Sequence, residues 1–236
     1  MLREIFQAAV GDELVQANPV VGVKRPKLPR RGWRILTPAE VPAVLGAFTD
    51  TRARLVCMTV LLTGLRRCEV RGLRWQDVNL LEGTLRVAAS KTEAGERLVA
   101  LPGTLVAALE AHYASTAYKA DGNYVFGHPE LGSALDAMWY AREFRKALAA
   151  AGITDYVRPF HDGRHAALTN MAAAGANPVA LMSVAGHTSM STTKIYLHLA
   201  GMVFRDEATA LEQRLLGTAP APVRVDGWVE EAAEAQ

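Results

Sequence analysis

Six residues of this 236-residue chain have side chains whose types and spacing suit chemistry at a phosphate. In chain order they are Arg66, Lys91, His161, Arg164, His187 and Tyr196. Arginine stays charged and presents a planar fork of donors to oxyanions, and histidine exchanges protons near neutral pH. Tyrosine becomes a nucleophile when it loses its proton. A nucleophilic displacement at phosphorus would use all of these residue types.

The segments that hold these residues follow one another in a characteristic order. Arg66 lies in Thr-Gly-Leu-Arg-Arg-Cys-Glu, Arg164 in His-Asp-Gly-Arg-His, and Tyr196 nine residues after a Gly-His pair. This order resembles the tyrosine recombinase or phage integrase family over residues 37–216. Two flanking stretches resemble the family as well: Glu-Arg-Leu-Val-Ala-Leu-Pro, which starts at Glu96, five residues after Lys91, and Ser-Thr-Thr-Lys-Ile-Tyr, which ends at Tyr196.

The resemblance implies an enzyme that performs site-specific DNA recombination, as integration or excision. Such a tyrosine recombinase cleaves and rejoins duplex DNA through a 3′-phosphotyrosine intermediate, a DNA strand transferase reaction of the topoisomerase IB kind. The phosphotyrosine keeps the energy of the broken phosphodiester, so a second DNA 5′-hydroxyl can rejoin the strand. We therefore expect no cofactor and no metal.

The chemistry explains why two arginines and a histidine accompany the tyrosine. The guanidiniums of Arg66 and Arg164 can bind the phosphate and stabilise the charge that its oxygens gain in the transition state. His161 lies three residues before Arg164, on the same helical face, and can act as hydrogen-bond partner or base. A tyrosine of ordinary pKa is ionised in only about one molecule in a thousand at pH 7, a deficit of roughly 4 kcal/mol, so Tyr196 needs a neighbouring cation or base.

The resemblance assigns roles to four further residues. It implies that Lys91 protonates the leaving 5′ oxygen and that His187 donates a hydrogen bond to a phosphate oxygen. Glu69, three residues after Arg66, is expected to orient that arginine or a histidine. His165 is expected to support its helix by hydrogen bonding.

Taken singly, each of these residues also has an ordinary structural interpretation. Arg66 could cap the preceding helix, Lys91 could be an exposed loop residue, and Tyr196 could be a half-buried core tyrosine. His161 and His165 are four residues apart, as in a helical zinc pair, but no third ligand is evident. The alternatives to a recombinase are a non-catalytic DNA-binding remnant of the same fold and a zinc hydrolase.

The charge of the chain is unevenly distributed. The chain has 26 basic and 24 acidic residues, of which the last 20 positions hold one and four, leaving 25 and 20 in residues 1–216. Six basic residues fall among eleven positions that contain no acid: Lys24, Arg25, Lys27, Arg30, Arg31 and Arg34. This stretch is either a solvated linker or a segment that binds along the DNA phosphates and releases their counterions. The second interpretation predicts that the DNA backbone is bound by Lys24, Arg25, Lys27, Arg30 and Arg31.

Hydrophobic periodicity and helix-capping signals predict a mainly α fold with a small antiparallel β-sheet, an α+β fold like that of the tyrosine recombinase catalytic domain. The sheet is a hairpin or a three-stranded sheet in residues 77–101, with Lys91 in its loop. The helices are expected at residues 3–16, 38–48, 52–63, 67–73, 104–116, 134–151, 161–174, 178–184, 189–199 and 203–216.

Four regions follow from these elements. We expect the last helix of a truncated core-binding domain in residues 1–20, a basic linker in 21–36, the catalytic domain in 37–216 and a disordered acidic tail in 217–236. One departure from the family falls in the third region, because Gly163 replaces a residue that is usually large and apolar. We expect this glycine to loosen the start of its helix.

Location and partners can also be anticipated. Neither a signal peptide nor an apolar run of the roughly 20 residues that cross a bilayer is present, so we expect a cytoplasmic protein with no membrane contact. The resemblance implies duplex DNA as partner, a homo-tetramer on DNA, a monomer free in solution and possible accessory DNA-bending proteins. In the family the terminal helix often docks on a neighbouring protomer, and here residues 203–216 suit that packing and packing within their own domain equally.

Overall fold

The structure is a computed structural model that describes residues 2–24, 34–87, 96–187, 189–200 and 213–215. It divides into two compact units, Met1–Trp33 and Arg34–Gln236, and each is considered by itself. Lys91, Arg25, Lys27, Arg30 and Arg31 lie outside the described residues, as do most of the predicted terminal helix and the whole predicted acidic tail.

The first unit contains helix α1 (Leu2–Gly11), which is shorter than the predicted helix over residues 3–16. The helix ends early because Glu13 adopts a left-handed conformation, with φ at 58°. That turn lets the amide of Leu14 donate to the carbonyl of Ala9 (2.9 Å), which satisfies an acceptor that the helix end would leave unpaired. The predicted end at residue 16 is therefore wrong, and the apolar spacing beyond Gly11 does not continue the helix.

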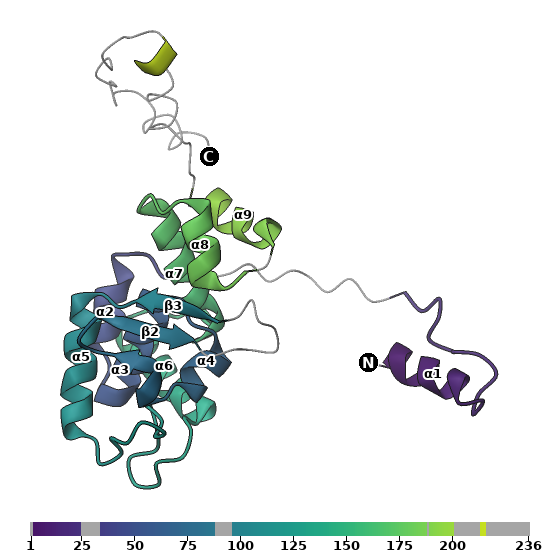
Figure 1. Ribbon diagram of the computed structural model, residues 1–236, viewed down its shortest axis with the longest axis horizontal. Helices are drawn as coiled ribbons and strands as arrows, with labels where there is room; N and C mark the ends of the chain where they lie inside the picture. The colour runs from purple at the N-terminus through teal and green to yellow at the C-terminus, as the bar shows by residue number, and fades with distance from the viewer. Residues whose placement is uncertain (1, 25–33, 88–95, 188, 201–212, 216–236) are drawn as a thin grey trace. The chain divides into compact units, whose positions relative to one another are not determined.

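The second unit is mainly helical, and its described part carries one small sheet (Figure 1). Its helices are α2 (Glu40–Gly46), α3 (Thr51–Thr63), α4 (Arg67–Gly72), α5 (Gly103–Ser115), α6 (Ala137–Ala150), α7 (His161–Ala173), α8 (Pro178–Ala185) and α9 (Met190–Leu199), with a 3₁₀ turn η1 (Trp75–Asp77). The predicted fold class is confirmed, and each described helix of this unit lies where a helix was predicted.

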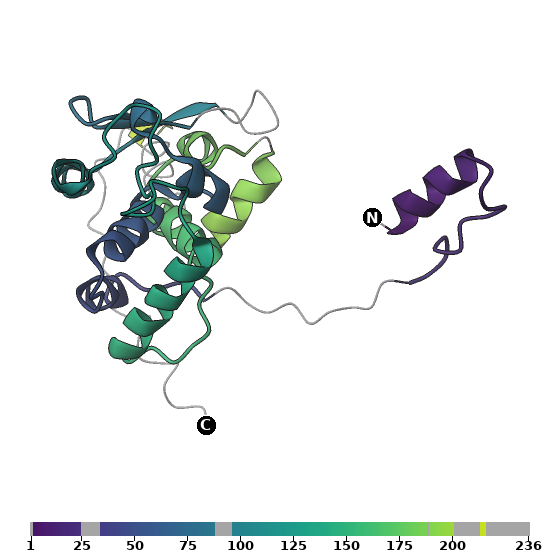
Figure 2. The same ribbon diagram turned by 90° about the horizontal axis from the view of Figure 1, so that it is seen from below.

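The sheet of the described residues has three antiparallel strands in the order β1 (Val78–Asn79), β2 (Thr84–Val87) and β3 (Arg97–Ala100). Leu85 pairs with Val99, and both side chains face the core. By the same alternation Arg97 also faces inward, although it is charged. Figure 2 shows the sheet along one side of the helices, so an inward side chain from β3 points toward them.

Side-chain caps set the helix ends that lead toward the predicted site. A capping box precedes α2: the amide of Thr37 donates to the carboxylate of Glu40 (2.8 Å), and the amide of Glu40 donates to the hydroxyl of Thr37 (3.3 Å). Helix α3 begins at the cap Asp50 and ends at Gly64, whose left-handed φ of 65° turns the chain toward Arg66. These local signals explain why the helix positions could be read from the sequence.

Arg34 belongs to the second unit. Its guanidinium pairs with Glu40 (2.5 Å) at the start of α2 and with Asp155 (2.7 Å) in the loop before α7. The chain is therefore attached to this unit from Arg34 onward. No helix among the described residues is long and apolar enough to cross a membrane.

The core is built around α3, which packs against α5, α6 and α7. Helix α7 approaches α3 at Gly163, where an added Cβ would lie only 2.8 Å from Cγ1 of Val60. The glycine thus allows the two helices to come close, and Gly163 is itself buried. Gly163 sits at a tight helix contact, so the expected loosening of this helix start is not what the packing shows.

The Gly163 contact gives a prediction about stability. Gly163→Leu should lower the free energy of unfolding by about 1–3 kcal/mol, because the new side chain meets the stiff Val60. Chemical denaturation measures the loss, and Gly46→Leu, at an exposed helix end with open space, is the matched control with little expected change. Val60→Ala should cost clearly less in the Gly163→Leu background than alone. Equal costs in both backgrounds would show that the two positions do not press on each other.

Candidate active site

Five of the six predicted catalytic residues lie around one cavity of about 490 Å³, together with His165. They reach it from different elements: Arg66 precedes α4, His161 and Arg164 are in the first turn of α7, His187 follows α8, and Tyr196 is in α9. Helices α7, α8 and α9 lie beside one another in both views (Figures 1 and 2). The tertiary structure therefore assembles these residues from segments up to 130 positions apart in the sequence, from Arg66 to Tyr196.

Arg164 lies at the base of the site and is only 9% exposed. Its guanidinium donates to the carbonyls of Gly64 (2.5 Å) and Ala185 (2.6 Å), which ties the turn after α3 to the end of α8. Burial, together with the positive charge of Arg66, lowers the pKa of Arg164 to about 10. Arg164 therefore remains a cation at neutral pH, fixed by two backbone carbonyls.

His187 contacts Arg164 through its ring nitrogen Nε2, at 3.1 Å from Nη2 of the guanidinium. Because a guanidinium can only donate, Nε2 must accept, and the proton of neutral His187 must sit on Nδ1. Nδ1 then donates to the hydroxyl of Thr193, 3.1 Å away. Burial and the nearby Arg164 lower the pKa of His187 to about 4, so the neutral ring is the stable form.

Tyr196 is almost completely buried, with 3% of its surface exposed. It packs with Leu168 and Ala185, and its ring lies 5.4 Å from that of His165 and 5.9 Å from that of His187. Burial raises the pKa of the phenol, while the positive charges of Arg164 and Arg66 act to lower it. Tyr196 is therefore a neutral phenol in the DNA-free chain, with two cations beside it.

His161 and His165 face each other across one turn of α7, with their Nε2 atoms 3.2 Å apart. One ring must donate and the other accept, so the pair is held together by one proton. Burial lowers the pKa of both rings, that of His165 to about 4, and the charge of Arg158 lowers that of His161 further. Among the described residues no group of three or more His, Cys, Asp and Glu side chains could hold a metal ion.

Glu69 joins two arginines beneath the cavity. Its carboxylate accepts from Nη1 of Arg66 (2.8 Å) and from Nη2 of Arg97 (2.9 Å). Burial acts to raise the pKa of Glu69, but the hydrogen bonds from Arg97 and Arg66 outweigh it and hold the pKa at about 2. Glu69 thus contacts Arg66 through its carboxylate, and its role in orienting that arginine stays a prediction.

Sequence reasoning missed two arginines of this region. Arg67 lines the cavity and is exposed, and Arg97 is buried behind it. Arg97 had one detectable signal, because it occupies an inward position of the alternating strand Arg-Leu-Val-Ala. A charge at a core position requires a partner, and Glu69 supplies it.

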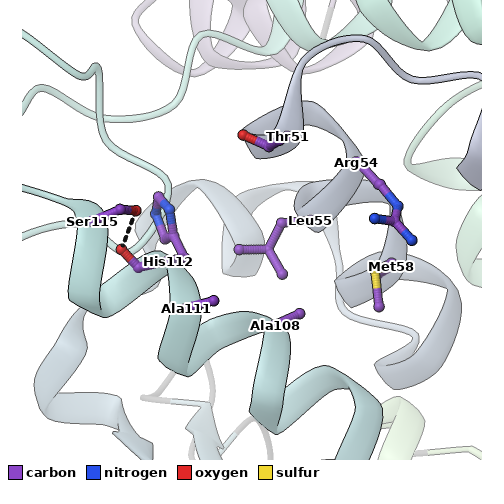
Figure 3. A pocket seen from close by; sticks show the side chains of 8 residues that line it. All are labelled: Thr51, Arg54, Leu55, Met58, Ala108, Ala111, His112 and Ser115. Atoms are coloured by element: carbon purple, nitrogen blue, oxygen red, sulfur yellow. Dashed lines mark hydrogen bonds between the residues drawn. The ribbon is translucent and has the colours of Figure 1, made fainter.

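A second cavity, of about 350 Å³, lies between α3 and α5 and contains none of the predicted site residues (Figure 3). Its histidine, His112, is held by the carbonyl of Val125 (2.7 Å), and the hydroxyl of Ser115 donates to the His112 carbonyl (3.0 Å). Aliphatic side chains such as Leu55 and Met58 form much of the wall. One arginine, Arg54, lines this cavity, but none of the candidate residues around Tyr196 does.

The histidine surroundings give a prediction about pH. In an NMR titration of the free protein, His165 and His187 should both stay neutral until about pH 4, below the ordinary value near 6.5. Each signal can be assigned by its loss in the corresponding His→Gln variant, and the same signals in urea should return to about 6.5. A midpoint at 6.5 or above for either histidine in the folded chain would contradict the described burial.

The same shifts determine how stability depends on acid. Between pH 6.5 and 4 the unfolded chain binds protons at His165 and His187 that the folded chain does not bind. The free energy of unfolding should therefore be highest above pH 6.5 and decrease as the pH falls toward 4.

Comparisons with known proteins identify the fold and its family. Residues 34–201 match the phage integrase family. A tyrosine recombinase of Pseudothermotoga lettingae is 28% identical over 204 residues, covering 84% of this chain and 68% of that protein. The crystal structure of XerA recombinase aligns with a TM-score of 0.63 at 28% identity, covering 80% of this chain and 67% of that one.

One further solved structure shows the same fold. The integrase of transposon Tn1549, solved in complex with a circular intermediate DNA, aligns with a TM-score of 0.70 at 21% identity, covering 90% of this chain and 76% of that one. The family match covers well over half of the chain and includes every segment that lines the cavity. The chain therefore belongs to the phage integrase family of tyrosine recombinases.

Proposed function

We propose that this chain performs site-specific DNA recombination by cleaving and rejoining duplex DNA through a 3′-phosphotyrosine at Tyr196. The observation that supports this most is the cavity that Tyr196 lines together with Arg66 and Arg164 and with the histidines at positions 161 and 187, whose pKa values are lowered. Membership of the phage integrase family and a relative named as a tyrosine recombinase support the same reaction.

In the proposed cleavage step, the scissile phosphate is bound by Arg66 and Arg164. The two guanidiniums stabilise the charge that gathers on the non-bridging oxygens. The phenol oxygen of Tyr196 attacks phosphorus, the bond from phosphorus to the 5′ oxygen breaks, and the phenol proton passes to neutral His161. Lys91 protonates the leaving 5′ oxygen; this role comes from the sequence, because Lys91 lies outside the described residues.

His187 has to change its hydrogen bonding for the role that we propose. In the DNA-free chain its Nε2 accepts from Arg164. A bound phosphate offers Arg164 a charged acceptor and favours a second proton on the ring, so Nε2 can then donate to a phosphate oxygen. Rejoining reverses the cleavage step, with the 5′-hydroxyl of a second strand attacking the phosphotyrosine.

The partners of the reaction are also proposals. Duplex DNA is the substrate, and the basic linker, of which Lys24 is described and exposed, would lie along its backbone. We propose that four copies assemble on DNA from monomers, with accessory DNA-bending proteins where the site requires them. The residues in the cavity already supply the charge stabilisation and the proton acceptor, so the reaction should proceed in EDTA without added cofactor.

A duplex with a nick next to the cleavage point tests this function, because the short product diffuses away and traps the covalent intermediate. At low salt the wild-type chain should form a DNA adduct that survives denaturation, and mass spectrometry should locate it on the peptide that contains Tyr196. A chain that binds the duplex yet forms no adduct would instead be the non-catalytic DNA-binding remnant. An adduct that requires stoichiometric zinc would favour a zinc hydrolase.

A further inference from the structure

A third arginine lies behind the cavity, and the proposed reaction does not use it. Arg97 is the first residue of β3, and its side chain is 5% exposed. Its guanidinium forms a two-pronged bond with Glu69, at 3.0 Å from Nη1 to Oε1 and 2.9 Å from Nη2 to Oε2. Its Nε donates to the carbonyl of Val184 at 2.8 Å.

Glu69 and Val184, which Arg97 contacts, belong to the two segments that carry reactive groups. The Glu69 carboxylate also accepts from Nη1 of Arg66 (2.8 Å) and from the Arg66 amide (2.7 Å). Val184 is in the last turn of α8, three residues before His187. Arg97 therefore links the support of Arg66 to the segment that presents His187.

The glycine between these segments shows how close the link is. Gly186 has a left-handed φ of 61°, and its carbonyl accepts from Nη2 of Arg66 (2.7 Å). An added Cβ would lie 2.9 Å from Nη1 of Arg97 and 3.2 Å from Nη1 of Arg66. The two guanidiniums occupy the space that a side chain at position 186 would need, so Arg66, Arg97 and the turn before His187 pack as one group.

We propose that Arg97 is a positioning residue of the strand-cleavage reaction: it holds Arg66 through Glu69 and the His187 segment through the Val184 carbonyl. The proposal rests on the proposed function. Its physical basis is the planar fork, because only a guanidinium can bind both carboxylate oxygens and a carbonyl in one plane. Removal of Arg97 would leave the buried carboxylate of Glu69 with the more exposed Arg66 as its cationic partner. Glu69 would then no longer hold the Arg66 guanidinium in one orientation.

The first test compares adduct formation by Arg97→Met with wild type at saturating nicked duplex. The rate should fall about 10- to 100-fold, the cost of losing charged hydrogen bonds, while the Kd for DNA changes less than about threefold. Arg86→Met, on the neighbouring strand with its side chain 50% exposed, is the matched control and should keep the wild-type rate. An unchanged rate for Arg97→Met, or a loss confined to DNA affinity, would overturn the proposal.

A pH profile distinguishes positioning through Glu69 from general damage to the fold. Arg97 is the strongest of the groups that lower the pKa of Glu69, and burial opposes them. In Arg97→Met the pKa of Glu69 should rise, so the adduct rate should gain a decrease toward acid pH that wild type lacks. In Arg97→Met/Glu69→Gln that decrease should vanish although the rate stays low, because no carboxyl remains to titrate.

Arg97→Lys completes the series, since it keeps the charge and loses the fork. Its pH profile should stay flat like that of wild type, and its rate should remain several-fold low. A wild-type rate in Arg97→Lys would show that charge alone suffices, and identical pH profiles in wild type and Arg97→Met would refute the link through Glu69.

A measurement without DNA separates this proposal from the proposed function. Nitrogen-15 NMR of the free protein reports the guanidinium signals of Arg66, which are assigned by their loss in Arg66→Lys. In wild type these signals should be sharp, and their protons should exchange slowly with water. In Arg97→Met the signals should broaden at a temperature below the melting temperature of the variant, where the chain is still folded. Failure of wild type to form an adduct refutes the function alone, whereas an unchanged Arg66 signal refutes the role of Arg97.

Discussion

Tyr196→Phe should form no covalent adduct with the nicked duplex under conditions in which wild type does. The substitution removes only the phenol oxygen, which is the atom that we propose attacks phosphorus. The ring itself should still fill its place between Leu168 and Ala185, because phenylalanine has the same shape. The loss should therefore be complete for chemistry and small for stability.

A denaturing gel with end-labelled DNA measures the adduct, and a melting curve confirms that the variant is folded. Tyr113→Phe is the matched control, since Tyr113 packs on Trp75 away from the cavity and should keep the wild-type rate. Adduct from Tyr196→Phe at the wild-type level would mean that another residue is the nucleophile. Tyr196→Phe should still bind intact duplex. Retained binding without adduct would assign the lost step to cleavage.

The second large effect is expected for Arg164→Lys, with a decrease of about 100- to 1000-fold in the rate of adduct formation. Lysine keeps one positive charge, but it cannot donate to the carbonyls of Gly64 and Ala185 while also presenting a planar fork to the phosphate. Removal of one fixed donor from a transition-state oxyanion site typically costs a factor of this size. The charge alone is thus insufficient.

Single-turnover rates at saturating DNA measure this effect. Arg71→Lys is the matched control, because Arg71 also donates to a backbone carbonyl, that of Leu135 (3.0 Å), outside the cavity. If Arg164→Lys cleaved within tenfold of wild type, the directed hydrogen bonds of Arg164 would not matter to the reaction. A decrease that disappears at high DNA concentration would place Arg164 in binding rather than in the cleavage step.

The sequence predicted the helices of the second unit well because their signals are local. Thr37 and Glu40 lie three residues apart, and Gly64 ends α3 by its own conformational freedom. Prediction failed in α1, where the apolar spacing suggested a helix to residue 16 but Glu13 turns the chain after Gly11. A left-handed glutamate gives no sequence signal of the kind that glycine gives.

The catalytic candidates were predictable for another reason. Reaction chemistry restricts their types, and their order along the chain resembles one family, so Tyr196 could be singled out although a lone tyrosine carries no such information. What each neighbour does to it was not predictable. The burial of Tyr196 that raises its pKa arises from packing among α7, α8 and α9.

The sequence by itself thus determined the candidate reactive residues, where most helices begin and end, and the family of the chain. Only the tertiary structure decided that Arg97 reaches Glu69, 28 positions away, that Arg66 bonds the carbonyl of Gly186, 120 positions away, and that His187 accepts from Arg164. Helix caps and strand alternation act between near neighbours, whereas these bonds join distant segments that meet only when the core around α3 has formed.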